Sequence, residues 1–213
     1  MNRIKAFFKN EKVRYPFHVL SHPMDGYYEI RHRDMGSVPM AFFLIFCVSL
    51  LFSMNRIHAS FVVNDVDART VNSLTELVAI MMLYMLFCVG NWSITCLMGG
   101  EGRLKDILIA VGYATLPLII AYIPAILISQ VLAANEEAFY TIIIGIGVAY
   151  ALLMGFMGIM TVHNFTLGKT IITVFLTFVA MLVIIFVVVM ITDLVNQVYN
   201  FFYSIYLELL YRG

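Results

Sequence analysis

The stretch TIIIGIGVAYALLMGFMGIMTVHNFTLGKTIITVFLTFVAMLVIIFVVVM, residues 141–190, decides the fold class. Its one charged side chain is Lys169, and most of the other residues are apolar or small. An α-helix needs about 20 mostly apolar residues to cross a hydrocarbon core of about 30 Å. The stretch lacks the period-two alternation of a lipid-facing β-strand. It therefore predicts two helical membrane spans joined by a short turn at Lys169.

The rest of the chain has the same character. Hydrophobic residues make up 62% of its 213 residues and charged residues 12%, which is too little polar surface for a domain in water. Five stretches are free of Asp, Glu, Lys and Arg and long enough to span: Met35–Asn55, Leu77–Gly100, Ile107–Asn135, Ala138–Gly168 and Thr170–Thr192. The turn between the third and fourth falls at residues 134–137. We predict an all-α fold, a polytopic membrane helix bundle with five transmembrane helices.

The predicted spans divide the chain into three parts. Residues 1–36 form a basic amino-terminal segment, residues 37–192 the five-span domain, and residues 193–213 an aromatic-rich interfacial tail. Ile4, Phe7 and Phe8 recur at helical spacing among basic residues, which favours a short helix on the membrane surface. A frayed basic tail is the alternative. The carboxyl-terminal part either continues the last span or lies flat on the outer leaflet.

Basic residues in the loops predict the orientation of the chain. Ten Lys and Arg residues precede the first span or follow the second and fourth spans, and three lie on the other side. Loops rich in Lys and Arg stay in the cytoplasm. We therefore expect a cytoplasmic amino terminus and a carboxyl terminus outside.

Composition and motifs exclude several function classes. Lys plus Arg (13) balance Asp plus Glu (13), so nothing favours nucleic acid as a partner. Cys47, Cys88 and Cys96 lie in apolar runs and suggest neither a disulfide framework nor a zinc spacing. Nucleophile-elbow, phosphate-loop and dinucleotide motifs are missing from the sequence. We predict a protein that is not an enzyme and needs no cofactor.

Residues 18–34 collect side chains of the types that bind metals: His18, His22, Asp25, Glu29, His32 and Asp34. Pro23 and the Met-Asp-Gly turn after it interrupt the helical spacing of the first two histidines, and no HExxH pattern occurs. We expect a solvated interfacial segment here, and no metal site.

Polar residues and prolines inside the spans have two possible uses. Asn91 and Thr95 share a face of the second span, either as a pore lining or as an interhelical hydrogen bond worth about 1 kcal/mol. Pro117 and Pro124 each remove a backbone donor from the third span and predict kinks, used as a hinge or for packing alone. We favour the hydrogen bond for the first pair and packing for the second.

Small residues form a ridge on the fourth span. Gly147, Ala151 and Gly155 repeat at every fourth position, a spacing that lets another helix backbone approach closely. We expect this ridge to pack against another span of the same chain. Contact between copies in a homo-oligomer is the alternative.

The loop 99–106 is the best candidate for a functional surface. It carries both charge signs, with Glu101 and Asp106 against Arg103 and Lys105, and three of its eight residues are glycine. Those glycines give the loop backbone freedom. We hypothesise that the loop, the basic amino-terminal segment and Lys169 form one cytoplasmic face that a partner reads. The alternative is that Arg103 and Lys105 only set the topology.

Three stretches resemble the Yip family, five-span membrane proteins named for interacting with Ypt/Rab GTPases. They are HPMDGYYEIRHRDMGSV (22–38), GGEGRLKDILIAVGYATLP (99–117) and VHNFTLGKTI (162–171). The shared motifs are a glycine-rich turn, Gly112-Tyr113 before Pro117, and a His-Asn-Phe segment. The resemblance covers about residues 23–192 and includes the topology.

The resemblance implies a cytoplasmic amino terminus and no known catalytic activity. Eukaryotic members act in transport between endoplasmic reticulum and Golgi, partly by recruiting Rab GTPases. This chain lacks their long cytoplasmic extension with its acidic-Leu-Tyr segment and is more similar to the short bacterial branch, which implies the plasma membrane.

Two function classes follow. One is a non-enzymatic scaffold or adaptor that organises membrane partners or local membrane shape, in contact with the lipid bilayer and with protein partners still to be identified. The other is a small-solute permease, channel or transporter subunit. The uncharged spans and amphipathic ends favour the first class, while the proline-containing span and the Asn91/Thr95 face keep the second open.

Overall fold

The computed structural model describes residues 11–64 and 66–212. Every regular element in these residues is a helix, and five helices are long and apolar enough to cross a membrane. The five are Val38–His58, Ser73–Leu97, Leu104–Ser129, Glu137–His163 and Leu167–Tyr211. The predicted all-α bundle with five spans is therefore confirmed. The surface helix predicted around Ile4, Phe7 and Phe8 lies outside the described residues.

The described elements follow one another in the order α2 (Glu11–Ser21), α3 (Pro23–His32), α4 (Val38–His58), η1 (Ala68–Thr70), α5 (Ser73–Leu97), α6 (Leu104–Tyr113), α7 (Leu116–Ser129), η2 (Ala134–Glu136), α8 (Glu137–His163) and α9 (Leu167–Arg212). The short 3₁₀ turn η2 joins the third and fourth spans where the sequence predicts their turn.

Pro117 divides the third span into two helices. α6 ends at Tyr113, four residues before it, because the proline ring would clash with the Tyr113 carbonyl in a continuous helix. α7 begins at Leu116 and has Pro117 in its first turn, where a proline is tolerated. Pro124 lies inside α7, which continues to Ser129. The span is thus interrupted at the first proline and continuous through the second.

The amino-terminal helices α2 and α3 pack onto the bundle. Each buries one apolar face, formed by Tyr15, Val19, Tyr27 and Ile30. The Tyr27 hydroxyl donates a hydrogen bond to the Ala110 carbonyl of α6, 3.3 Å away. The metal-type side chains of residues 18–34 stay on the outer faces of these helices, where His18, His22, Asp25, His32 and Asp34 are exposed. The helix is interrupted at Pro23 as the sequence predicts, since α2 ends at Ser21 and Pro23 is the first residue of α3.

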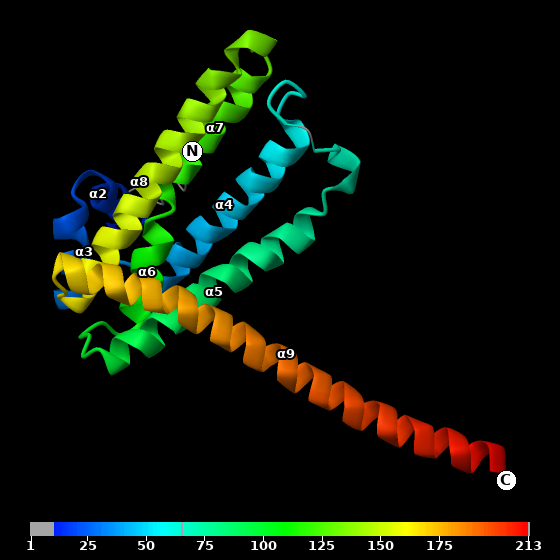
Figure 1. Cartoon of the computed structure of the whole chain (residues 1–213). Helices are drawn as coiled ribbons and strands as arrows, with labels where there is room; N and C mark the ends of the chain where they lie inside the picture. The colour runs from blue at the N-terminus through cyan, green and yellow to red at the C-terminus, as the bar shows by residue number, and fades with distance from the viewer. Residues whose placement is uncertain (1–10, 65, 213) are drawn as a thin grey trace.

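The body of the bundle is built from α4, α6, α7 and α8 (Figure 1). Tyr113 of α6 lies fully buried among these helices, and its hydroxyl accepts a hydrogen bond from the Ser37 N–H at 3.0 Å. α5 packs against α4 and α6 and contacts α9. We call the end of the bundle that holds α3, the loop 98–103 and the turn 164–166 the basic end.

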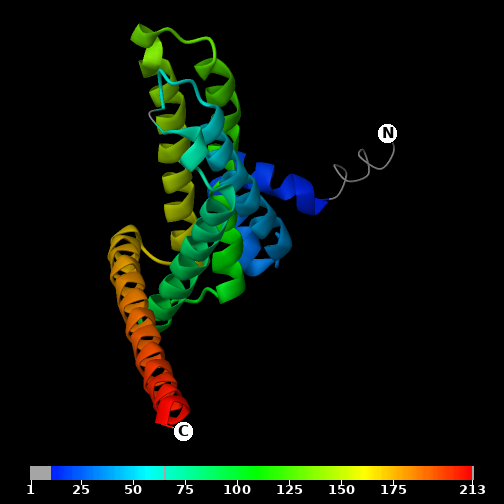
Figure 2. The same cartoon turned by 90° about the vertical axis from the view of Figure 1, so that its right-hand side faces the viewer.

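The last helix, α9, runs away from the rest of the molecule (Figures 1 and 2). It is continuous over 46 residues, a length of about 69 Å at about 1.5 Å per residue, or about twice the hydrocarbon core. The residues beyond 192 therefore continue the last span as helix, one of the two alternatives for the tail. Its contacts are mainly with α5, near its own beginning.

Candidate functional site

A buried carboxylate organises the basic end. Asp106 is the third residue of α6 and is completely buried. It accepts hydrogen bonds from the Arg103 backbone N–H at 3.2 Å and from the Arg103 Nε at 2.9 Å. It also pairs with Arg31 of α3, with 3.8 Å between the charged atoms. One carboxylate therefore caps α6 and ties it to α3.

A second, exposed carboxylate extends this network to the surface. Asp34 accepts a hydrogen bond from Arg103 Nη2 at 2.6 Å and one from Lys105 Nζ at 3.1 Å. The hydrogen bond from Arg103, and next that from Lys105, lowers the pKa of the Asp34 carboxyl below its ordinary value. Asp106 and then Asp34 raise the pKa of the Arg103 guanidinium. The surface part of the network therefore stays charged at neutral pH.

The end of α8 closes the same cluster through His163. This side chain is buried, and its Nδ1 accepts a hydrogen bond from the Gly102 N–H at 3.2 Å. A Cβ atom added at Gly102 would lie 2.6 Å from the His163 Cε1, and one added at Gly100 would lie 2.7 Å from its Nδ1. These two glycines are therefore required because the imidazole lies against the loop, and not for the flexibility predicted from the sequence.

The predicted partner surface is only partly available. Glu101, Arg103 and Lys105 are exposed. Asp106 has no exposed surface, so the prediction that it forms part of the partner surface is wrong. Its carboxylate instead caps the first turn of α6 and pairs with Arg31 and Arg103. We call Asp34, Glu101, Arg103 and Lys105 the charged face.

The sequence does not predict that three residues belong to this cluster: Arg31, His163, and Asp34, which it singles out only among the metal-type side chains of residues 18–34. A signal existed for Asp106, because an acidic residue three positions after a helix cap is typical of a capping box. None existed for the pairing of Arg31 with it, since the two helices are far apart in the sequence. All three missed residues do lie in the quoted stretches 22–38 and 162–171.

The intramembrane polar residues lie between α5 and α9. Asn91 and Thr95 are both fully buried. The Asn91 Nδ2 donates a hydrogen bond to the Thr177 Oγ1 of α9 at 3.0 Å. Thr177 in turn donates to the Thr173 carbonyl at 2.8 Å. This arrangement favours the interhelical hydrogen bond over a pore lining.

The ridge on α8 makes contacts of unequal closeness. A Cβ atom at Gly147 would overlap the Cβ of Ala121 on α7, whereas one at Gly155 would make an ordinary contact of 3.8 Å with Ala114. Gly158, outside the predicted triplet, packs on the ring of Tyr27, with 3.2 Å to its Cζ from an added Cβ. The half-buried Ala151 lies between them in the sequence. The closest approaches therefore occur at Gly147 and at Gly158, three residues beyond the predicted ridge, and both are contacts within the chain.

Polar contacts also join the spans at the opposite end of the bundle. Glu76 at the start of α5 accepts a hydrogen bond from the Ser53 hydroxyl at 2.5 Å and pairs with Arg56. Asn55 and Tyr140 exchange hydrogen bonds of 2.7 and 2.9 Å. These contacts tie α4 to α5 and to α8. In residues 11–64 and 66–212, no three His, Cys, Asp or Glu side chains converge as they would around a metal ion.

The fold and the site together define a five-span helical membrane protein with a cluster of charged residues built on Asp106 at one end of the bundle. The family model of the Yip1 domain matches residues 17–191, and the chain belongs to this family. No curated protein and no solved structure matches it. The match includes every residue of the cluster built on Asp106.

Proposed function

We propose that this Yip-family protein is a non-enzymatic membrane scaffold or adaptor that binds a protein partner at its charged face. The observation that carries the proposal is the convergence of α3, α6 and α8 on Asp106 and His163, which holds the charged face in one conformation. A preorganised surface loses little conformational entropy when a partner binds. A role of the trafficking type, as in eukaryotic relatives, is one form this function takes.

The orientation of the chain belongs to the same proposal. The distribution of Lys and Arg supports a cytoplasmic basic end and a carboxyl terminus outside. The plasma membrane as the location rests on the resemblance to the short bacterial branch. A reporter that is active only in the cytoplasm should then work at the amino terminus and fail at the carboxyl terminus. Activity at both ends would contradict the five-span topology.

The alternative, a small-solute permease, channel or transporter subunit, has less support. A solute path needs polar groups that face an open passage. In the described residues, Asn91 and Thr177 face each other instead and are buried.

Site-specific photocrosslinking in native membranes tests the adaptor function. A photoreactive amino acid at Glu101 should give discrete adducts with a partner protein, and a Lys105→Gln change should weaken them. The same probe at Leu152, an exposed residue within α8, is the control and should give none of these adducts. Identical adducts at both positions, or adducts insensitive to Lys105→Gln, would refute a partner site on the charged face.

A further inference from the structure

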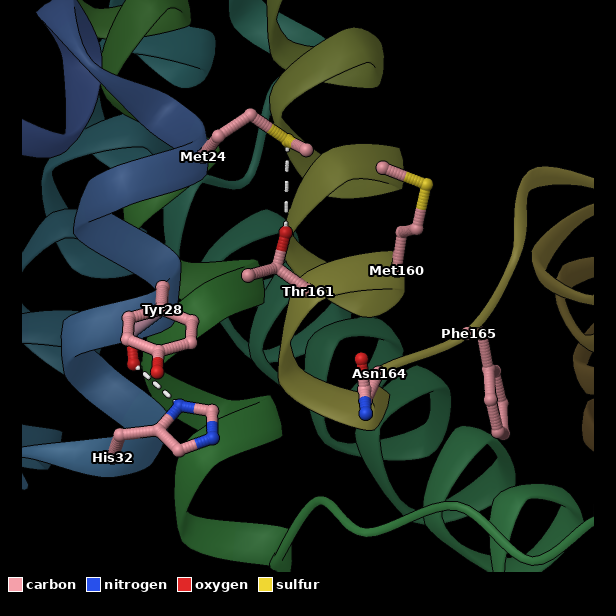
Figure 3. Close-up of a pocket in the computed structure, with 7 residues that line it drawn as sticks. All are labelled: Met24, Tyr28, His32, Met160, Thr161, Asn164 and Phe165. Carbon is pink, nitrogen blue, oxygen red and sulfur yellow. Dashed lines mark hydrogen bonds between the residues drawn. The ribbon is translucent and has the colours of Figure 1, made fainter.

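A pocket of about 380 Å³ lies between α3 and the end of α8 (Figure 3). This volume falls within the range of about 300–1,000 Å³ that is typical of ligand pockets. Its lining residues on α3 follow one another at every fourth position, and those opposite belong to α8 and the turn after it: Met24, Tyr28, His32, Met160, Thr161, Asn164 and Phe165. The pocket lies beside the charged face but shares no residue with it.

The pocket is apolar at one end and polar at the other. Figure 3 shows the two methionine side chains at one end, and His32 and Asn164 at the other. Met24 contacts Thr161, with 3.7 Å between the Met24 Sδ and the Thr161 Oγ1. Thr161 lies within α8. Asn164 lies just beyond the last residue of α8. The apolar end therefore points along α8 into the membrane, and the polar end points to water.

Hydrogen-bonding groups are left free at the polar end. The Nδ1 of His32 donates to the Tyr28 carbonyl at 3.0 Å, and its ring stacks on that of Tyr28 at 4.0 Å, so the Nε2 is left for a ligand. The exposed Asn164 side chain extends beside the pocket (Figure 3). The His32 ring is held in place by these two contacts, and the Asn164 backbone adopts a left-handed conformation with φ of 54°.

A positive charge lies beside one of the lining residues, Phe165. The ammonium group of Lys169 lies 4.1 Å from the centre of the Phe165 ring, a cation–π contact. Among the described residues, no carboxylate forms an ion pair with it. The ring of the buried His163 also stacks on the Phe165 ring, with 5.3 Å between the two ring centres. The site therefore offers a fixed cation without its own counter-ion.

We propose that this pocket binds the headgroup of an anionic phospholipid. The phosphate lies at the polar end, where the Asn164 amide donates a charge-assisted hydrogen bond to its oxygens and the nearby Lys169 ammonium group supplies positive charge. The glycerol and the first chain carbons lie between Met24 and Met160, and the acyl chains continue into the bilayer. Basic pockets beside membrane helices recognise lipid headgroups by this chemistry. The proposal does not depend on a protein partner at the charged face.

Photolabelling of the full-length protein in nanodiscs of phosphatidylcholine tests the site. The probe is a phosphatidylglycerol with a photoreactive acyl chain, and the labelled peptides are mapped by mass spectrometry. We expect labelling of the peptides that carry Met24 and Met160. Lys169→Gln should reduce it about tenfold, because it removes the positive charge near the phosphate. Asn164→Gly, which keeps the left-handed backbone, should also reduce it. Arg33→Gln is the matched control, because Arg33 pairs with Glu29 and not with the pocket.

The competition arms separate the possible ligands. Unlabelled phosphatidylglycerol should displace the probe, while extra phosphatidylcholine and millimolar inorganic phosphate should not. Displacement by inorganic phosphate would overturn the lipid assignment in favour of a free anion. Equal labelling of all lipid-facing helices, or labelling unchanged in both Lys169→Gln and Asn164→Gly, would overturn the site itself. Met160→Trp, which fills the pocket without removing a polar group, provides a second variant and should abolish the label.

Discussion

Replacing Gly147 by alanine should separate α7 from α8. The added methyl group would overlap the Cβ of Ala121, whereas a methyl group at Gly145 on the same helix meets nothing within 4 Å. Both changes favour an isolated helix by about 1 kcal/mol, so this contribution cancels when the two variants are compared. The clash remains, and overpacking of this kind costs about 1–3 kcal/mol. We therefore expect Gly147→Ala to be less stable than Gly145→Ala by that amount.

The comparison requires unfolding of the purified protein in an SDS titration, followed by the fluorescence of Trp92, the one tryptophan of the chain. Ala121→Gly removes the opposing methyl group, so Gly147→Ala should cost little in the Ala121→Gly background, a comparison in which the helix cost of the new glycine cancels. Equal unfolding free energies for Gly147→Ala and Gly145→Ala would refute the close helix contact. A loss that Ala121→Gly does not repair would place the clash elsewhere.

Three further predictions concern the polar contacts. Asp106→Asn should lower the free energy of unfolding by about 2–3 kcal/mol, because it leaves Arg31 and Arg103 without their carboxylate. The cost is no larger because Arg103 is half exposed and water can hydrate it. Asp34→Asn at the surface is the matched control and should cost nothing measurable. The depressed pKa of Asp34 means that its ion pairs are intact above the ordinary aspartate value of 3.8 and are lost as the pH falls through the lower, folded value; an NMR titration of its carboxyl carbon should show this midpoint, and a midpoint at or above 3.8 would contradict the pairing. Thr177→Val should weaken the contact of α9 with α5 by about 1 kcal/mol in the SDS titration, and an unchanged value would mean that the Asn91 hydrogen bond does not hold these helices.

The spans were predictable because few kinds of backbone structure can cross a bilayer. A run of about 20 apolar residues has to be a helix there, since every backbone group must be satisfied inside the segment. The limits of the spans were less accurate. The charge-free stretch Met35–Asn55 corresponds to α4, which begins at Val38 with Pro39 in its first turn and includes Arg56 near its end. Arg56 is accepted there because it pairs with Glu76, a contact that no local pattern reveals.

The packing of α2 and α3 was not predictable by the same reasoning. Their sequences are mixed and interrupted by prolines, so their apolar faces show only once the position of the bundle is known. Tyrosines such as Tyr15 and Tyr27 add to the difficulty, because they are buried in the structure although tyrosine is also common at membrane interfaces. The Tyr27 ring fills space beside Gly158, and its hydroxyl finds the Ala110 carbonyl, so a residue that reads as interfacial becomes part of the core.

The cluster at the basic end links the three chain segments that carry the family's motifs. Arg31 comes from the helix before the first span, Asp106 begins the third, and His163 ends the fourth. The three are joined by direct contacts: Arg31 and Arg103 pair with Asp106, and the loop 98–103 packs against the His163 imidazole through Gly100 and Gly102. A partner at the charged face and a lipid between α3 and α8 would therefore act on the same packed unit from its two sides.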